Sequence, residues 1–279
     1  MQTRNTKSSK AQNFVVQGSI LAVAGIIVRL IGMLYRIPLI EIIGQEGNGY
    51  YTSAFSVYSI LLIVSSYSLP TAVSKMVAGR IAVGQYKNSH RILKAALIYA
   101  TVVGAAAALV LWLGADLFAR LLGMPFCRMA LKSLAPTVWI MAYLGVLRGY
   151  FQGHSTMVPT AISQLLEQIV NAAVSIGAAS FLMKKGLEAD LVYGETRYSS
   201  AFGAAGGTIG TGAGAAIALF FFIFMLFSYR PIMRRQSRRD RSGRLDSYGR
   251  ISLVLTITIL PIVLSSTVYN ISSVLDNYL

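Results

Sequence analysis

The sequence is poor in the residues from which most enzymes build a reactive or metal-binding centre. It has one cysteine, Cys127, and only two histidines, His90 and His154, far apart along the chain. A single cysteine permits neither an internal disulfide nor a cysteine-based metal site. No HExxH, CxxC or paired-carboxylate pattern occurs. We therefore expect no bound metal, no cofactor and no enzymatic activity.

Charged residues are also scarce, at 13% of the chain, whereas 55% is hydrophobic and the mean hydropathy is +0.60. Apolar runs of about 20 residues, the length that crosses a bilayer as a helix, recur from end to end. The sequence thus predicts an all-α polytopic membrane protein. The expected spans are residues 14–43, 51–83, 92–113, 131–151, 158–183, 201–228 and 251–279.

The beginning of the chain lacks the pattern of a cleaved signal peptide. Residues 1–13 are polar and lead into an apolar run longer than the core of such a peptide. We expect this run to be the first permanent span.

Lys and Arg outnumber Asp and Glu by 25 to 10. Nucleic-acid binding could explain such an excess, but its distribution indicates a membrane. The N-terminal segment and the even-numbered connections between spans hold sixteen Lys and Arg, with Arg148 counted in the fourth connection, and the odd-numbered connections hold six. Cytoplasmic loops carry such an excess. The sequence therefore predicts a cytoplasmic N-terminus and no nucleic-acid partner.

The longest polar interruption divides the chain. Residues 229–250 are strongly basic, so we expect a cytoplasmic loop between a six-helix lobe at 14–228 and the first helix of a second lobe at 251–279. That last span runs to the end of the sequence. Transporters commonly consist of two related helical halves. We therefore expect the remainder of a C-terminal lobe to be the missing partner of this chain.

Residues 203–222, GAAGGTIGTGAGAAIALFFF, are rich in glycine. Residues 210–215 fit the dinucleotide pattern GxGxxA, but that pattern needs a preceding strand and a later acidic residue. An apolar helix follows instead. Small residues in such a helix favour close packing against a neighbouring helix.

Two arginines, Arg29 and Arg36, fall within the first predicted span. Seven residues are about two helical turns, so both side chains project from one face. A charge in mid-bilayer is costly and usually faces a polar cavity. Guanidinium groups suit phosphate or carboxylate ligands, which favours an anionic substrate. Pro38 is expected to kink or end this helix.

Three further charges lie within predicted spans. Glu167 is in the fifth span, Lys75 is near the end of the second, and Asp276 is in the seventh. Either acid could pair with an arginine in one transport state and release it in another. Lys75 could equally extend its ammonium group to the membrane surface. With the two arginines, these residues form the predicted substrate-binding set.

Two segments resemble a known transporter family. They are residues 46–80, EGNGYYTSAFSVYSILLIVSSYSLPTAVSKMVAGR, and residues 147–171, LRGYFQGHSTMVPTAISQLLEQIVN. They are similar to the bacterial polysaccharide-biosynthesis transporters of the stage V sporulation protein B type, which are related to the lipid II flippase MurJ within the MOP exporter superfamily. The resemblance covers most of residues 10–185.

The resemblance implies two six-helix lobes in a V, alternating access across the bacterial cytoplasmic membrane, and transport of an undecaprenyl-pyrophosphate-linked glycan precursor. In such flippases cavity arginines engage the pyrophosphate. Arg29 matches the first by its place in RLIG, and Arg36 matches a second approximately. Ser65 and Ser66 replace an arginine of MurJ, and Asn171 replaces a basic residue common in relatives. These departures argue against lipid II, though not against another lipid-linked anion.

Other functions remain open from the sequence alone. A cation-coupled exporter of small amphipathic compounds has the same fold, but a cavity bearing arginines would repel cations. A membrane-embedded glycosyltransferase or polymerase needs a positioned acid or base, and the spans offer few. The chain could also be an inactive fragment, because half a transporter has no opposite lobe to move against.

Overall fold

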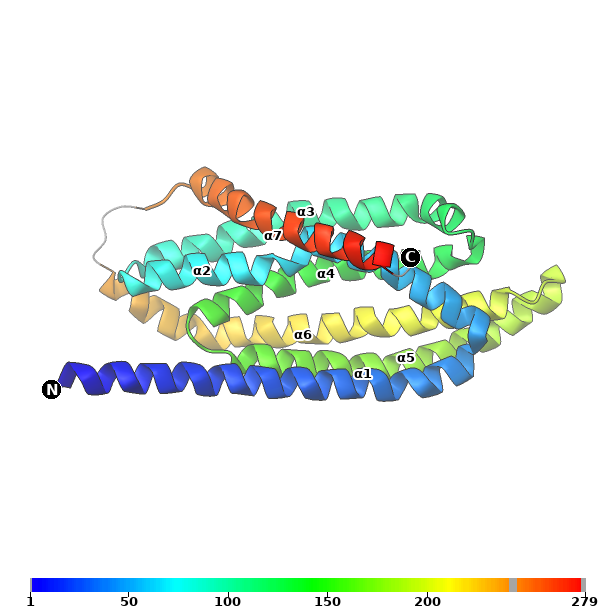
Figure 1. Ribbon diagram of the computed structural model, residues 1–279, viewed down its shortest axis with the longest axis horizontal. Coiled ribbons are helices and arrows are strands. Elements are labelled where there is room, and N and C mark those ends of the chain that lie inside the picture. Colours follow the sequence, from blue (N-terminus) through cyan, green and yellow to red (C-terminus); the bar gives the residue numbers. More distant parts are fainter. Residues whose placement is uncertain (1, 241–244, 277–279) are drawn as a thin grey trace.

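The computed structural model describes the backbone of residues 2–240 and 245–276 and the side chains of residues 16–240 and 245–265. All regular structure in these ranges is helical, which confirms the predicted fold class. The helices form one elongated bundle, with α1, α5 and α6 along one side and α2, α3, α4 and α7 along the other (Figure 1). Their bounds are α1 (Gln2–Leu62), the π-helical turn η1 (Ile63–Tyr67), α2 (Leu69–Ala82), α3 (Tyr86–Leu121), the 3₁₀ turn η2 (Pro125–Cys127), α4 (Arg128–Gly153), α5 (Val158–Tyr193), α6 (Tyr198–Arg239) and α7 (Tyr248–Asp276).

Helix α1 breaks at Gly44. This residue has φ 69° and ψ 177°, a backbone conformation that is essentially restricted to glycine. The chain turns back at this end of the bundle and continues as helix to Leu62 (Figure 1). Pro38 lies inside the helix, and its φ and ψ stay helical. The prediction that Pro38 ends or kinks the helix was wrong in position, because proline removes one backbone donor whereas Gly44 leaves the helical region altogether.

Six stretches of the described chain are long and apolar enough to cross a membrane. The first, Val16–Ala82, contains the Gly44 break and so covers the two spans predicted at 14–43 and 51–83. The next four coincide with α3 to α6 and the sixth with the start of α7, so each of the seven predicted spans falls on helix over its described residues, apart from short turns. The chain is a multi-pass membrane protein.

Glycines on α4 allow it to approach α2 closely. Gly145, Gly149 and Gly153 recur every fourth residue, and a Cβ atom on any of them would collide with α2 or the turn before it. At Gly149 the collision would be with Pro70 and Val73. This spacing of small residues is a common means of packing membrane helices.

The glycine-rich segment of α6 packs in the same way against α5. A Cβ atom on Gly210 would collide with Ser175, and one on Gly214 with the carbonyl oxygen of Glu167. Small residues are therefore required here by helix contact. The reading of this segment as a packing surface, instead of a nucleotide-binding loop, is confirmed.

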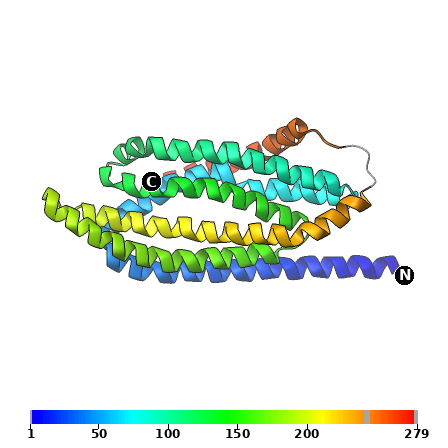
Figure 2. The same ribbon diagram turned by 180° about the vertical axis from the view of Figure 1, so that it is seen from behind.

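Helix α4 is the centre of the bundle and contributes to both hydrophobic clusters (Figure 2). Leu144 and Phe151 belong to the cluster shared with α2, α3, α6 and α7, and Leu131 and Leu134 to the cluster shared with α1, α3, α5 and α6. A central helix buried on most sides fixes the position of any polar side chain that it carries.

Two segments that the sequence analysis placed outside the spans are partly helical. Helix α1 is already helical at Gln2, within the polar segment predicted at 1–13. Helix α6 continues to Arg239, so the first part of the basic segment predicted as a loop at 229–250 is helix. Helix α7 packs onto the bundle through Ile251, Leu255 and Ile259, which are all buried.

Candidate functional site

Arg29 and Arg36 lie on one side of α1, and both are exposed. Seven residues bring a helix to within about 20° of its starting direction, so the two side chains project nearly in parallel. Within the described part of the chain neither forms an ion pair. The side of α1 turned away from them carries exposed apolar residues such as Leu30 and Leu34. The arginines thus form a basic edge beside an apolar face.

Contacts between α1 and α5 fix the relative height of the two helices. A Cβ atom on Gly32 would lie 3.1 Å from the amide nitrogen of Gln168. One turn further, the Asn171 amide donates to the Tyr35 hydroxyl at 3.4 Å. Since both pairs have the same offset in residue number, Glu167 lies at the height of residue 31 of α1. That height falls between the two arginines.

Glu167 is paired with an arginine of α4. The guanidinium Nη2 of Arg148 lies 2.5 Å from Oε2 of Glu167, and its Nε donates to the Ser163 hydroxyl at 3.3 Å. The side chains of Arg148 and Glu167 are only 11% and 20% exposed. The pair therefore lies largely inside the bundle, where a carboxylate without its cation would be strongly unfavourable.

The position of Arg148 corrects one sequence-based expectation. Arg148 was counted with the connection after the fourth span, but it lies within α4. Glu167, expected to pair with an arginine in one transport state, has Arg148 as its partner in this structure. The sequence did contain a signal for Arg148. It is a charged residue inside the apolar run at 131–151, just as Arg29 is a charged residue inside the apolar run at 14–43.

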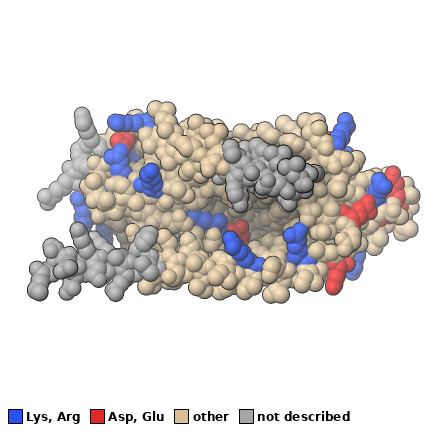
Figure 3. Space-filling view, viewed as in Figure 1, with Lys and Arg blue, Asp and Glu red and all other residues tan. Residues whose placement is uncertain are grey.

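Three arginines are consequently at similar depth. At 1.5 Å per residue, Arg29 and Arg36 lie roughly 3 Å and 8 Å along the α1 axis from the height of the Arg148–Glu167 pair. Figure 3 shows that the middle of this face is hollowed, with a basic and an acidic group in its floor and basic side chains along its edge over α1. Among the residues of α1 whose side chains are described, the basic ones are Arg29 and Arg36. The arrangement concentrates positive charge around one depression.

A cavity of about 410 Å³ borders Arg36. It lies between the two parts of α1, and its remaining lining is mostly hydroxyl groups and aromatic rings: Gly32, Tyr35, Tyr51, Thr52, Phe55, Ser56 and Ser59. The hydroxyls of Tyr35 and Tyr51 are 3.2 Å apart. The guanidinium can donate hydrogen bonds to a phosphate. The neighbouring hydroxyls can donate to or accept from the hydroxyls of a sugar.

Ser65 and Ser66, near which the family resemblance implies an arginine, are turned inward. Ser65 and Ser66 lie in the π-helical turn η1, and both are buried. The Ser65 hydroxyl donates to the Leu61 carbonyl at 2.7 Å and contacts the Ser66 hydroxyl at 3.1 Å. A fourth basic group is therefore absent at this position.

One residue of the predicted set, Lys75, is not brought to the hollow. It is exposed in the middle of α2 and lines a separate cavity beside α7. The backbone of Asp276 belongs to α7, but its side chain lies outside the described residues. The structure thus groups Arg29, Arg36 and Glu167, adds Arg148, and separates Lys75 from them.

Among the described residues, no group of three or more His, Cys, Asp or Glu side chains could hold a metal ion. The chemistry available in the hollow is that of charge and hydrogen bonding.

Comparison with known proteins identifies the family of the chain. The family model described as polysaccharide biosynthesis protein matches residues 15–240. The chain belongs to this family. Its predicted resemblance to the transporters of the stage V sporulation protein B type is confirmed.

Three similar proteins come from Bacillus subtilis. The uncharacterized membrane protein YabM is 29% identical over 233 residues, which cover 83% of this chain and 40% of YabM. The lipid II flippase MurJ is 30% identical over 201 residues, covering 68% of this chain and 37% of MurJ. Stage V sporulation protein B is 29% identical over 224 residues, covering 80% and 40%. The chain spans about two fifths of the length of these relatives.

A solved structure shares the fold. A MOP superfamily transporter from Pyrococcus furiosus superposes with a TM-score of 0.62 at 16% identity, over 95% of this chain and 54% of that one. The helical arrangement described above is therefore that of MOP superfamily transporters.

Proposed function

We propose that this chain belongs to a flippase that moves an undecaprenyl-pyrophosphate-linked glycan precursor across the bacterial cytoplasmic membrane. The product would serve the synthesis of cell wall, spore cortex or surface polysaccharide. The proposal rests on family membership and on the basic hollow, and it treats the chain as part of an alternating-access transporter whose other lobe lies outside these residues.

The observation that carries the proposal is the gathering of Arg29, Arg36 and Arg148 within roughly 8 Å of one height around a hollow. Charge inside a membrane is retained where it has a function. A pyrophosphate has several oxygens that guanidinium groups bind in a bidentate manner. The hydroxyl-lined cavity beside Arg36 is suited to the sugar next to the phosphates.

In this proposal Glu167 competes with the substrate for Arg148. Its carboxylate is paired with the Arg148 guanidinium. A pyrophosphate that reaches the floor of the hollow would compete with that carboxylate for the same guanidinium. The pair would keep Arg148 compensated while the hollow is empty and release it when substrate arrives.

We further propose the domain order predicted from the sequence: an N-terminal segment at 1–13, a six-helix lobe at 14–228, a basic inter-lobe segment at 229–250 and the first helix of the second lobe from 251. The uneven distribution of Lys and Arg supports a cytoplasmic N-terminus.

A cation-coupled exporter is the second candidate, since a carboxylate does lie in the hollow. Glu167, however, is already neutralised by Arg148, and Arg29 and Arg36, which form no ion pair with a described residue, add positive charge nearby. This balance favours an anion over a cation. Drug export driven by a proton or sodium gradient would support the second candidate.

The test is rescue of a bacterial strain depleted of its essential flippase, with the complete coding frame that contains this chain. Wild type should restore growth and precursor flipping, whereas the Arg29→Ala/Arg36→Ala variant should not. Arg120→Ala, which removes an exposed arginine from another part of the bundle, is the matched control and should rescue. Equal rescue by wild type and the double variant would contradict the assigned role of the arginines.

A further inference from the structure

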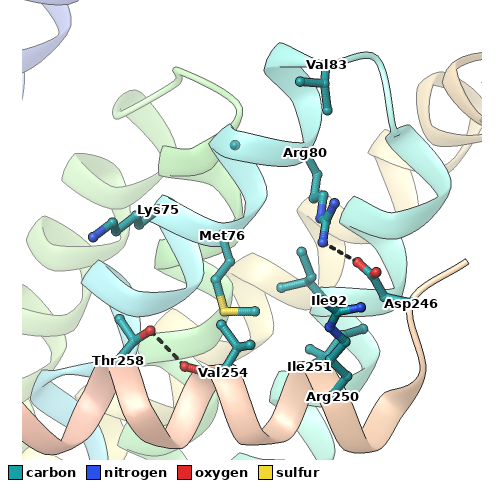
Figure 4. Close-up of a pocket in the computed structure, with 11 residues that line it drawn as sticks. Lys75, Met76, Arg80, Val83, Ile92, Asp246, Arg250, Ile251, Val254 and Thr258 are labelled. Atoms are coloured by element: carbon teal, nitrogen blue, oxygen red, sulfur yellow. Dashed lines mark hydrogen bonds and ion pairs between the residues drawn. The ribbon is translucent and has the colours of Figure 1, made fainter.

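A second cavity of about 410 Å³ lies where α2 ends and α7 begins. Figure 4 shows Arg80 directed toward Asp246 on one side of it and Lys75 on the other, with Met76 between them. The cavity is at the same end of the bundle as the N-terminus and the end of α6 (Figure 1). It is distinct from the hollow that contains Arg148 and Glu167.

The charges around this second cavity do not balance. Its lining contains the three bases Lys75, Arg80 and Arg250 but a single acid, Asp246. Arg80 is already engaged, because its Nη2 lies 2.5 Å from Asp246 and its Nη1 donates to Gln85 at 2.8 Å. Neither Lys75 nor Arg250 forms an ion pair with a described residue. The cavity therefore has two cations available for an anion from outside the chain.

Asp246, which lines the cavity, is held in place by hydrogen bonds to α3 as well as by its ion pair with α2. The Asp246 backbone N–H donates to the Asn88 side chain at 3.0 Å, and its carbonyl accepts from Arg91 at 2.7 Å. The Arg91 guanidinium also lies 5.0 Å from the centre of the Tyr248 ring. Asp246 is thus held by α2 and α3 together, which fixes the beginning of α7 beside the end of α2.

The rest of the lining is apolar and includes Met76, Val83, Ile92 and Val254. A cavity that combines basic and aliphatic side chains matches a molecule with an anionic head and a hydrocarbon tail. Basic pockets between membrane helices are a recurrent means of binding anionic lipid headgroups. The volume is within the range of about 300–1,000 Å³ typical of small-molecule sites.

We propose that this cavity binds the headgroup of an anionic phospholipid of the surrounding membrane. Lys75 and Arg250 contact the lipid phosphate from α2 and α7 respectively, and the glycerol and first acyl carbons lie against Met76 and Val254. The lipid bridges the two helices and holds α7 against the six-helix lobe. Lys75, predicted from the sequence to bind the transported substrate, is thereby assigned to a structural lipid.

The test is the binding of labelled phosphatidylglycerol to the purified 279-residue chain in phosphatidylcholine nanodiscs. The Lys75→Gln/Arg250→Gln variant should bind roughly thirtyfold more weakly, because each basic group near a membrane surface contributes about fivefold to binding. The control is Arg234→Gln/Arg235→Gln, which removes two exposed charges of α6 outside the cavity. The control should retain nearly wild-type affinity.

A second variant tests the cavity without changing the charge. Val254→Phe fills the apolar part and should also weaken phosphatidylglycerol binding. Equal losses in both charge-removal variants would overturn the proposal, because binding would then be due to diffuse surface charge. Displacement of the labelled lipid by inorganic phosphate, or by undecaprenyl pyrophosphate at lower concentration than by phosphatidylglycerol, would overturn the assignment to a membrane phospholipid.

This assay leaves Arg29, Arg36 and Arg148 unchanged and contains the polyprenyl compound only as a competitor. Failure of the flippase proposal would therefore leave the lipid result intact, and the reverse is also true.

Discussion

The hollow and the α2–α7 cavity each contain an arginine–carboxylate pair with the same separation, 2.5 Å. Arg148 and Glu167 both project from the interior of long helices, and their side chains are 11% and 20% exposed. Arg80 and Asp246 lie at a helix end and in a connection, and are 38% and 18% exposed. Separation alone thus says little about what each pair does.

The energetic importance of each ion pair depends on how far it is exposed to solvent. A pair close to water gains little, because the solvent screens it and competes for its hydrogen bonds. A pair inside the bundle is costly to break, because the remaining partner keeps its charge without compensation. The inner pair is therefore expected to control stability and substrate binding, and the outer pair only the local attachment of α7.

The largest effect is expected for Arg148→Ala. The substitution leaves Glu167 inside the bundle without its cation, which should cost on the order of 3–5 kcal/mol of stability. The melting temperature of the purified protein in detergent measures this loss. Arg120→Ala serves as the control. An unchanged melting temperature for Arg148→Ala would show that the Arg148–Glu167 pair does not stabilise the fold.

The combined change Arg148→Gln/Glu167→Gln separates stability from binding. Two neutral amides can still hydrogen-bond to each other, so the melting temperature should return close to that of wild type. Affinity for undecaprenyl pyrophosphate should nevertheless fall about ten- to hundredfold, since a hydrogen bond to a charged group contributes roughly 1.5–3 kcal/mol. Wild-type affinity in this variant would remove Arg148 from the binding site.

Arg36→Lys tests the shape of the basic group at the hydroxyl-lined cavity. The ammonium keeps the charge but loses the planar fork that binds two oxygens at once. We expect an affinity about tenfold weaker, with stability unchanged because Arg36 is exposed and unpaired among the described residues. If the Arg36→Lys variant binds the ligand as tightly as wild type, only the positive charge at this position matters for binding, and the planar shape of the guanidinium does not.

The smallest effect is expected for Asp246→Asn. The outer pair should contribute less than about 1 kcal/mol, and its contribution should disappear in high salt. The backbone bonds from Asp246 to Asn88 and Arg91 remain in this variant. The melting temperature should therefore change little, and a loss as large as that of Arg148→Ala would contradict the comparison between the two regions.

The fold could be predicted from the sequence because the membrane leaves few alternatives. An apolar run that crosses a bilayer must satisfy its backbone hydrogen bonds internally, so helix is the expected structure. The break in α1 was placed incorrectly because Pro38 is a visible signal, whereas the need for positive φ at Gly44 arises only from where the chain must turn.

The site was only partly predictable. Arg29 and Arg36 were recognised because both lie well inside one apolar run. Arg148 was missed because it lies near the end of its run, next to glycines that resemble a loop, and span boundaries are the least certain feature of a sequence. The partner of Glu167 depends on how α4 and α5 align, which no local pattern encodes.

The central claim is that the arginines of the hollow bind a lipid-linked pyrophosphate. Its most direct test is a titration of undecaprenyl pyrophosphate into the purified chain and into the Arg29→Ala/Arg36→Ala variant, with Arg120→Ala as the control. Loss of two charge-assisted contacts should weaken binding about hundredfold or more in the double variant and leave the control unchanged. The same affinity in all three proteins would contradict the account.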